Sequence, residues 1–484
     1  MREYLVSHAN KNRISFHMPG HKGSGIYKMY GYEDFLDRLM DCDITEIIGA
    51  DNLYQPEGII KSAEDMYQKL YEVEKSFLLV NGTTCGIIAA ILASVEPGKK
   101  LLMSRGCHKS TYNGAKLAGA IPVYVQPKTI KEAGIMGHVD CMDIKKALDE
   151  DDDIQAVILP SPNYYGICSD IKAIADVVHE KEKILIVDQA HGAHLKFFHK
   201  YGVGEGMPLA AEDCGADIVI NSIHKTLASF TQSAILNVVS KKVDYHDILE
   251  KIQLIQSTSP SYLLMCSLAI NAEIIKKHGE ELFRKWRNDI DWFYNKAKDI
   301  EGLILVDCPN LDKTKLNMNL GACGIRGYAF EQFLFKKKIL CELVTGDIVM
   351  GMTGIGNVRY DYQKLYDGIV DCIEELGAYE GKRGGFYENR KLIVNKQYTS
   401  NCNAFTIPSP GIVMPHGKEK ELVSLEGASG RISAVNVTPY PPGIPYACPG
   451  EQLTDEIIEE LINLREQKKL IYGVSEDGQI YVYK

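Results

Sequence analysis

The chain has 484 residues, which is too long for one small core and predicts two or three structural regions. Its net charge of −10 argues against a nucleic-acid partner, because nucleic-acid binders normally carry a basic stripe. The thirteen cysteines form no CxxC pair, and no secretory segment opens the chain. No apolar stretch is long enough to span a bilayer. We therefore predict a cytoplasmic protein with no membrane partner.

The first sixty residues are dense in glycine, histidine, proline and acid, and we predict an irregular N-terminal arm there. Short apolar runs then alternate with helical patterns. Strands are predicted at 76–80, 101–104, 121–126, 156–159, 184–187, 217–220 and 233–239, and helices at 61–73, 84–95, 110–118, 142–149 and 170–181. This alternation indicates an α/β fold with a mostly parallel seven-stranded sheet, covered on both faces.

A break in the alternation follows at 245–285, with helices predicted at 263–278 and 279–300. The remainder reads as a second, smaller α/β unit, with predicted elements at 303–306 (strand), 329–337 (helix), 339–344 (strand) and 453–467 (helix). We therefore divide the chain into an N-terminal arm, a large domain and a C-terminal small domain, at 1–60, 61–285 and 286–484.

The segment after the first strand of the sheet combines a glycine turn, hydroxyl side chains and a helix start: Asn81, Gly82, Thr83 and Thr84. Free N–H groups and the helix dipole converge at such a point and can hold a phosphate. Either threonine could equally be an ordinary helix N-cap, which is the more common role for a single such turn. The segment is not a Walker A loop, because no Gly-Lys-Ser/Thr follows at the required spacing.

His108 lies on the loop after the next strand, beside Cys107. An imidazole there can stack on an aromatic ring or move a proton, although a solvated loop histidine looks the same in a sequence. The neighbouring thiol suggests a cysteine nucleophile. However, adjacent side chains on a loop need not face each other, and no orienting Asn or Asp is evident.

Asp188 ends another apolar strand and is followed by His191 and His194. A buried carboxylate is costly unless a cation or hydrogen-bond donors face it. The HxxH spacing could ligate a metal, but no third ligand follows at a readable spacing, and we assign no metal. A protonated pyridine nitrogen is a cation that this carboxylate could hold.

Lys225 follows the strand predicted at 217–220, with Ser222 and His224 just before it. A lysine that forms an imine must lose its proton, which a desolvated strand end favours. Most loop lysines are exposed surface residues, but the other candidate groups also follow strands, at the edge where open α/β sheets bind ligands. An amine for a covalent bond and a carboxylate for the far end of a ring suit pyridoxal 5'-phosphate, which is the cofactor we predict.

The order of these motifs resembles that of the fold type I pyridoxal phosphate enzymes and, more narrowly, of the bacterial ornithine/lysine/arginine decarboxylases. The matching segments cover nearly the whole chain: FHMPGHKG at 16–23, DITE at 43–46, PEG at 56–58, NGTT at 81–84, CHKSTYNG at 107–114, DQAHGAH at 188–194, SIHKTL at 222–227, SPSY at 259–262 and PYPPGIP at 439–445. The chain is similar to the short form without an N-terminal wing domain. It departs at Gln189, where the family usually has glutamate, and this bears on the substrate more than on the cofactor.

The resemblance implies a role for each candidate residue. Lys225 would be the Schiff-base lysine, Asp188 the partner of the pyridine nitrogen, and His108 the residue stacked on the ring, with Ala190 on the opposite face. The phosphate would be held by Thr83, Thr84, Ser222 and His224, and the catalytic set would be Lys225, His108, Asp188 and His224. The phenolic oxygen of the cofactor would be approached by Asn163 or Tyr164.

The resemblance also implies α-decarboxylation of a basic L-amino acid. Arginine is favoured over lysine and ornithine, because short forms of the family include biosynthetic arginine decarboxylases. Lys225 or a nearby histidine would reprotonate the α carbon. The distal cation of the substrate needs an acid, and the arm offers candidates that could reach the active site of a partner subunit or could equally cap turns: Asp43, Glu46, Asp51 and Glu57. The family's sites lie at a dimer interface, so we expect a homodimer or a higher homo-oligomer.

An aminotransferase or a lyase of the same fold is the alternative. It would keep Lys225 and Asp188 and would bind the substrate carboxylate through an arginine of the C-terminal domain, for which Arg359 and Arg431 are candidates. A non-catalytic regulator built on this fold would be expected to lose the lysine, which this chain retains.

Overall fold

The computed structural model of the chain describes residues 1–131, 133–377, 411–412, 419–440, 443–466 and 469–484. Two residues of the PYPPGIP motif, Pro441 and Pro442, lie outside these ranges, as does the last residue of the helix predicted at 453–467. Within the described ranges, no helix has the length and apolar character needed to cross a membrane.

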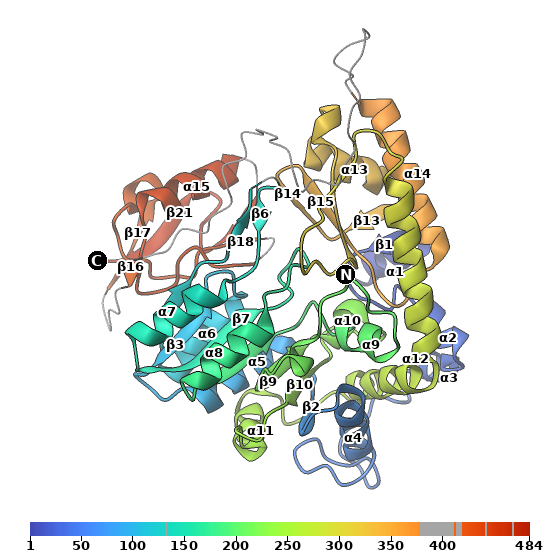
Figure 1. Cartoon of the computed structure of the whole chain (residues 1–484), viewed down its shortest axis with the longest axis horizontal. Helices are drawn as coiled ribbons and strands as arrows, with labels where there is room; N and C mark the ends of the chain where they lie inside the picture. Colours follow the sequence, from blue (N-terminus) through green and yellow to red (C-terminus); the bar gives the residue numbers. More distant parts are fainter. Residues whose placement is uncertain (132, 378–410, 413–418, 441–442, 467–468) are drawn as a thin grey trace.

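A seven-stranded sheet forms the centre of the large unit (Figure 1). Its strands follow the order β2 (Lys75–Leu79), β10 (Ala234–Val238), β9 (Ile218–Asn221), β8 (Ile184–Asp188), β7 (Ile154–Pro160), β3 (Lys100–Ser104), β4 (Ile121–Val125). All pairs are parallel except those of β10, which is antiparallel to both neighbours. The prediction of a mostly parallel seven-stranded sheet is confirmed, with each strand within two residues of its predicted bounds.

Helices cover the sheet on both faces. Leu101 and Met103 of β3 pack against one group of helices, whereas Leu102 between them packs against another, because successive side chains of a strand point to opposite faces. The first group contains α5 (Gly82–Ser94), α6 (Lys109–Ala118) and α11 (Tyr245–Ile255), and the second contains α7 (Cys141–Glu150) and α8 (Ile171–Glu180). Strands buried on both faces are mostly apolar, and this made them readable in the sequence.

The two helices predicted at 263–278 and 279–300 are one helix, α12 (Tyr262–Ala297). Gly279 lies in its middle, where a Cβ would come within 2.4 Å of the Tyr201 hydroxyl, so the glycine allows close packing and does not break the helix. The helix contacts both α4 (Ile59–Tyr71), beside the central sheet, and α14 (Arg359–Leu376), in the smaller unit. The predicted boundary at 285/286 falls inside it, and the division into three domains stays a prediction.

The smaller unit contains a four-stranded antiparallel sheet of β11 (Ile304–Leu305), β12 (Lys315–Asn319), β15 (Ile348–Met352) and β14 (Leu343–Thr345), in that order. The strand predicted at 339–344 divides into β13 (Ile339–Cys341) and β14 at Glu342, because β13 pairs with a different partner. The helix predicted at 329–337 is confirmed as α13 (Gly327–Lys336), which packs near α14.

The N-terminal arm is less irregular than predicted. It contains α1 (Arg2–Asn10), β1 (Ile14–Phe16), α2 (Gly25–Met29) and α3 (Glu33–Asp37). Strand β1 pairs in parallel with β13 of the smaller unit, although the two segments lie more than three hundred residues apart. A partner this distant leaves no local signal in a three-residue strand.

The last part of the chain packs beside the hairpin of β5 (Thr129–Ile130) and β6 (Ile135–Met136). Its core also includes side chains of the four-stranded sheet, such as Met350 and Met352. Its described elements are β16 (Gly411–Ile412), β17 (Lys420–Ser424), β18 (Thr438–Tyr440), β19 (Glu451–Gln452), α15 (Asp455–Glu466), β20 (Leu470–Tyr472) and β21 (Gln479–Tyr483).

Candidate active site

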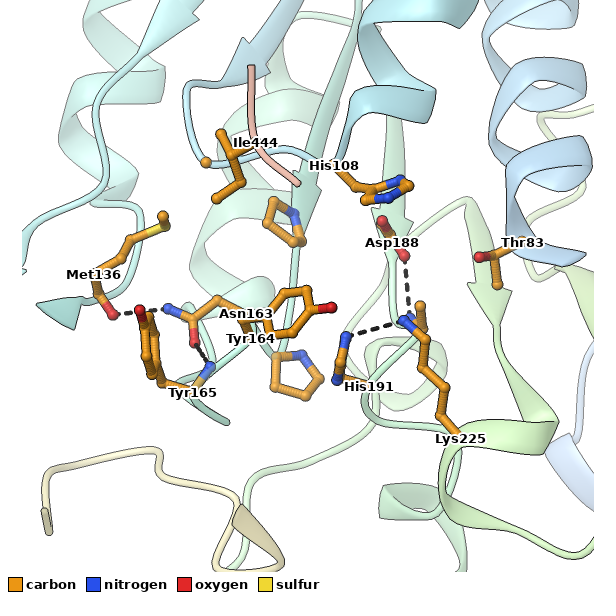
Figure 2. Close-up of a pocket in the computed structure, with 14 residues that line it drawn as sticks. Thr83, His108, Met136, Asn163, Tyr164, Tyr165, Asp188, His191, Lys225 and Ile444 are labelled. Carbon is orange, nitrogen blue, oxygen red and sulfur yellow. Dashed lines mark hydrogen bonds between the residues drawn. The ribbon is translucent and has the colours of Figure 1, made fainter. Parts of the chain in front are cut away.

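Four strand ends converge on one pocket (Figure 2). Asp188 ends β8, and Lys225 lies in the short helix α10 (Ile223–Thr226) directly after β9. His108 precedes α6, and Thr83 lies in the first turn of α5. Because the carboxyl ends of parallel strands meet at one edge, these residues come together as the sequence predicted. Five of the eight predicted cofactor residues line the pocket: Thr83, His108, Asp188, Ala190 and Lys225.

The amine of Lys225 meets the imidazole of His191. Lys225 Nζ donates to His191 Nε2 at 2.9 Å. Burial lowers the pKa of Lys225, and the positive charge of Lys315 lowers it further, whereas the carboxylates of Asp188 and Glu342 oppose this shift. A lowered pKa favours the neutral amine, which is the nucleophilic form that imine chemistry needs.

Asp188 is a buried carboxylate in the pocket wall. Its Oδ1 accepts one hydrogen bond, from the Ala190 N–H at 3.1 Å. Burial raises its pKa, while the charge of Lys225 and the Ala190 N–H lower it. No ion pair joins Asp188 to another of the described residues. A carboxylate in this position is suited to a cationic group of a ligand, because such a partner would offset its desolvation.

His108 is held as a neutral ring. Its Nδ1 accepts the Ser110 N–H at 3.3 Å, so that the ring acts as the N-cap of α6. Burial lowers the pKa of His108 to about 3, and the charges of Lys225 and Lys109 add to this. With Nδ1 accepting, the hydrogen of the neutral ring lies on Nε2. The side chain can therefore contact a ring without adding a positive charge.

The start of α5 offers free N–H groups beside Thr83. Gly82 has φ +70°, the left-handed conformation that forms the tight turn from β2 into the helix. The N-cap is Asn81 and not either threonine, and no side chain caps the first turn. Uncapped N–H groups at a helix start form an anion site. Thr83 faces the pocket, whereas Thr84 is exposed and does not line it.

Ser222 and His224 lie behind the pocket and do not line it. The two are buried, and Ser222 Oγ is 3.1 Å from His224 Nδ1. The same nitrogen donates to the Ser233 carbonyl at 3.0 Å, so the ring hydrogen is on Nδ1. Nε2 therefore has no hydrogen and is free to act as an acceptor. Burial lowers the pKa of His224 to about 4, against the effect of that carbonyl. Their phosphate role stays a prediction.

The FHMPGHKG segment, which had no role beyond its resemblance, supports the lysine turn from behind. The Gly20 N–H donates to the His224 carbonyl at 2.7 Å, and the Gly20 carbonyl accepts the Gly356 N–H at 3.0 Å. A Cβ on residue 20 would lie 2.3 Å from the carbonyl carbon of Thr226, so only glycine fits. The segment thus fixes the backbone on which Lys225 stands.

Tyr164, and not Asn163, has its side chain available to a ligand. The Asn163 amide donates to the carbonyls of Met136 and Gly137, both at 2.9 Å, and its oxygen accepts backbone N–H groups, so its polar atoms are engaged. The Tyr164 ring lines the pocket, with its centroid 4.5 Å from that of His191 and 6.0 Å from Lys225 Nζ.

The two histidines of the HxxH spacing point in different directions. His191 faces the pocket, whereas His194 is buried with Nε2 3.0 Å from Asp312 Oδ2. Among the residues with described positions, no group of three metal-ligating side chains comes together. The thiol of Cys107 is also buried and contacts the Ile158 carbonyl at 3.7 Å, and burial raises its pKa, so it is unsuited to act as a nucleophile.

Gln189, the departure from the family pattern, points away from the pocket. Its Nε2 donates to Glu212 Oε2 at 2.8 Å and to Asn221 Oδ1 at 2.9 Å, and its Oε1 accepts the Ala211 N–H at 2.7 Å. The Glu212 carboxylate is buried and receives amide N–H groups of Asn221 and Asn237 as well. The departure therefore concerns the network behind β8 and β9 and not a contact with substrate.

A Gln189→Glu variant is expected to lose about 1–3 kcal/mol of stability near neutral pH, because it places two carboxylates together in a buried site. Burial already raises the pKa of Glu212. The folded pair would hold a proton above the pKa of about 4.3 of an unfolded glutamate. The variant therefore retains its stability below the pKa of the unfolded glutamate. It loses that stability as the pH rises through the folded-state pKa of the pair. Thermal unfolding at about pH 5.5 and about pH 8 checks this, and an equal loss at both contradicts it.

Glu342 is an acid, not itself in the pocket lining, that the sequence analysis missed. Its side chain is 4% exposed, and Oε2 accepts the Met18 N–H at 2.9 Å and lies 3.5 Å from His17 Nδ1. Its charge acts on both Lys225 and Tyr164. The available signal was an acid inside the apolar run 339–344, where a solvated carboxylate has no reason to be.

The acids predicted to bind the distal cation do not line the pocket of their own chain. The Asp51 carboxylate caps the turn before α4, where it accepts backbone N–H groups of Asn52, Glu57, Gly58, Ile60 and Lys61. Asp43, Glu46 and Glu57 are exposed. A contact with the site of a partner subunit stays a prediction for these three.

Hydrogen bonds from Arg105 hold the last part of the chain against the pocket. Its guanidinium is buried and donates to the Pro445 and Tyr446 carbonyls, both at 2.7 Å. Between Gly443 and Pro445, Ile444 forms part of the pocket wall. The GIP part of the motif, residues 443–445, therefore closes the site from the C-terminal side.

The fold is similar to that of solved enzymes. It superposes on the constitutive lysine decarboxylase of Escherichia coli with a TM-score of 0.72 at 19% identity, over 100% of this chain and 81% of that one. For L-threonine transaldolase from Pseudomonas fluorescens, solved in its internal aldimine state, the TM-score is 0.59 at 14% identity, over 77% and 87% of the two chains. The fold is therefore that of the fold type I pyridoxal phosphate enzymes, and the lysine and aspartate at its strand ends suit that cofactor.

Sequence comparison narrows the class. Residues 1–315 match the family model of the Orn/Lys/Arg decarboxylase major domain, and residues 392–479 match that of its C-terminal domain. The chain is 32% identical to the Bacillus subtilis protein YaaO, over 99% of this chain and 97% of that one. It is 30% identical to an arginine decarboxylase of Halalkalibacterium halodurans, over 96% and 92%. The chain belongs to the Orn/Lys/Arg decarboxylase family.

Membership confirms the predicted enzyme class, a pyridoxal phosphate-dependent decarboxylase, and the residues present fit the cofactor. Asp188 is a buried carboxylate with no ion-pair partner among the described residues, as a pyridinium nitrogen requires. The uncapped start of α5 offers N–H groups to a phosphate, and the neutral His108 ring lines the same pocket.

Proposed function

We propose that this chain decarboxylates a basic L-amino acid, with arginine as the first choice and lysine or ornithine next. The observation that carries the proposal is the pairing of a pyridoxal phosphate site with a second buried carboxylate, Glu342, whose charge acts on the same amine as that of Asp188. Arginine comes first because relatives of 28–30% identity that match over nearly their full length are named arginine decarboxylases. Those named lysine decarboxylases are 22–24% identical.

Lys225 and Asp188 would hold the two ends of the reactive part of the cofactor. The bound cofactor supplies an electron-poor ring that accepts the electrons left by departing CO₂. Asp188 would keep the pyridine nitrogen protonated, since its buried carboxylate favours a cation beside it. Lys225 would bind through its ε-amine, which burial and Lys315 bias toward the neutral form.

The remaining predicted residues would orient the cofactor. His108 and Ala190, both in the pocket wall, would contact opposite faces of the ring. The phosphate would lie at the start of α5, with the Thr83 side chain directed toward it. Thr84, Ser222 and His224 would act from outside the pocket lining, so their contribution to phosphate binding is expected to be smaller than that of Thr83 and the α5 N–H groups.

Glu342 would receive the distal cation of the substrate. Asp188 is committed to the far end of the cofactor ring, which leaves Glu342 as the other carboxylate acting on Lys225. Its backbone lies between β13 and β14, and the N–H of Met18 holds one of its oxygens. A guanidinium or an ammonium would offset the cost of burying this charge.

A proton must return to the α carbon after CO₂ departs. Lys225 is the proposed donor because its Nζ lies in the pocket and is hydrogen-bonded to His191 Nε2 at 2.9 Å. Burial and the nearby lysines lower the pKa of His191, so this ring is neutral and serves as the acceptor that orients the amine.

The aminotransferase alternative loses its candidate carboxylate-binding residues. Arg359 Nε is 2.7 Å from Oδ1 of Asp289, a buried residue of α12. Arg431 pairs with Glu421 and the Tyr483 carbonyl near the end of the chain. Neither arginine lines the pocket.

We also propose a cytoplasmic homodimer. Exposed apolar side chains gather in the N-terminal arm: Tyr4, Leu5, Val6, Met29, Met40, Ile47, Ile48 and Ile59. Apolar groups concentrated in one segment favour association with a second copy. The cysteines whose positions are described are all unpaired, which suits a reducing compartment.

The test incubates the purified protein and pyridoxal 5'-phosphate separately with L-arginine, L-lysine and L-ornithine, and measures CO₂ and the product amine. Arginine is expected to give the highest kcat/KM. Formation of keto acid without CO₂ from any of the three would favour the aminotransferase and reject the proposal.

A further inference from the structure

Lys315, the first residue of β12, is completely buried where the two α/β units meet. Its ammonium donates to three oxygens, the His191 carbonyl at 2.7 Å, Asp312 Oδ2 at 2.8 Å and Thr314 Oγ1 at 3.1 Å. Lysines are almost never removed from water without such partners. One of the three bonds reaches the loop that carries the imidazole facing Lys225.

A second arm of the same network reaches the other side of Lys225. Asp312 Oδ2 is 3.0 Å from His194 Nε2, and His194 Nδ1 is 3.1 Å from Thr226 Oγ1, in the residue directly after Lys225. The side chains of Lys315, Asp312 and His194 are 0% exposed. Although burial alone would raise it, His194 and Lys315 hold the pKa of Asp312 far below its usual range.

We propose that Lys315 is a positioning residue for Lys225. Through the His191 carbonyl it fixes the imidazole that accepts the Lys225 amine, and through Asp312 and His194 it fixes the turn of α10. Its buried positive charge also favours the neutral form of that amine. The inference rests on the proposed covalent role of Lys225 and adds a residue from the smaller unit that prepares it.

The electrostatic part of the proposal depends on every charge that faces Lys225. The titratable groups around it come from each neighbouring element: Asp188 at the end of β8, His191 after it, His108 before α6, Tyr164 after β7, His224 within α10, and Glu342 between β13 and β14. Burial keeps the three histidines neutral. The two carboxylates raise the pKa of Lys225, so Lys315 is the cation that opposes them.

The experiment measures how fast the full-length apoenzyme forms a borohydride-stable bond with pyridoxal 5'-phosphate between about pH 6 and pH 10. The rate requires the neutral amine and should rise through the pKa of Lys225. The double variant Asp312→Asn/Lys315→Met removes the buried pair without leaving one charge unpaired. Its inflection is expected to move upward by about one pH unit relative to the unaltered chain.

Lys196→Met is the matched control. Lys196 is also a buried lysine paired with carboxylates, Asp213 and Glu72, but it does not act on Lys225, so its inflection should stay unchanged. If the double variant folds and its inflection does not shift, Lys315 contributes only to the stability of the fold, and the inference is overturned. If the double variant does not fold, Lys315→Arg is measured instead. This variant keeps the positive charge and should keep the inflection, so a shifted inflection overturns the proposal. Failure of the unaltered chain to form any bond at Lys225 overturns the proposed function itself.

Discussion

Replacement of Lys225 by alanine is expected to reduce decarboxylation by about 10³-fold or more and to abolish the borohydride-stable bond to pyridoxal 5'-phosphate. The amine projects into the pocket, its pKa is lowered by burial, and it donates to His191 at 2.9 Å. Its removal takes away both the covalent anchor and the nearest proton donor to the α carbon. Release of CO₂ gives the activity, and mass spectrometry of the reduced, digested protein gives the modified residue.

Lys22 is the matched control for this prediction. Burial lowers its pKa to about 7, so it too has a neutral amine available at mildly alkaline pH. However, its Nζ is bound to the His17 carbonyl at 2.6 Å and the Met352 carbonyl at 3.1 Å, and it does not line the pocket. Lys22→Ala should keep the modification on Lys225. A modified peptide containing residue 22, or a reducible bond in Lys225→Ala, would contradict the assignment.

The sheet was predictable because its strands are buried on both faces. A strand such as 184–188 is apolar at every position until its terminal aspartate, and no exposed face interrupts the pattern. Helix α12 was predicted as two helices divided at Gly279, where close contact with Tyr201 requires a glycine. Strand β1 was missed because its partner β13 lies more than three hundred residues away.

The site also has a part that local sequence patterns predict and a part that depends on contacts between distant segments. Thr83, His108, Asp188 and Lys225 each follow a strand, and the topology of an α/β sheet brings such positions to one edge. Lys315, Asp312 and His194 become a network only when β12 packs on the loop after β8, and no local pattern marks that contact. Gln189 could be identified as unusual, but only its bond to Glu212 shows that it faces away from the substrate.

Replacement of Glu342 by glutamine is expected to lower kcat/KM for arginine about 30- to 1,000-fold, equivalent to about 2–4 kcal/mol. The side chain is 4% exposed, and its charge is felt at Lys225 and Tyr164, so a substrate cation beside it would be largely desolvated. Glutamine keeps the size and an oxygen for the Met18 N–H at 2.9 Å but removes the charge. Steady-state kinetics with each basic amino acid measures the loss.

Glu46→Gln separates this proposal from recognition by a partner subunit. Glu46 is exposed in its own chain and was predicted to reach the site of a second copy. If Glu46→Gln causes the large loss and Glu342→Gln does not, the distal cation binds the partner's acid and Glu342 only holds the Met18 N–H. Slow turnover of norleucine, which has no distal cation, should be unaffected by Glu342→Gln. The uncharged side chain of norleucine makes no ion pair with residue 342, so its turnover does not depend on the carboxylate. If Glu342→Gln lowered kcat/KM for norleucine as much as for arginine, the variant would disturb the cofactor site and not substrate recognition.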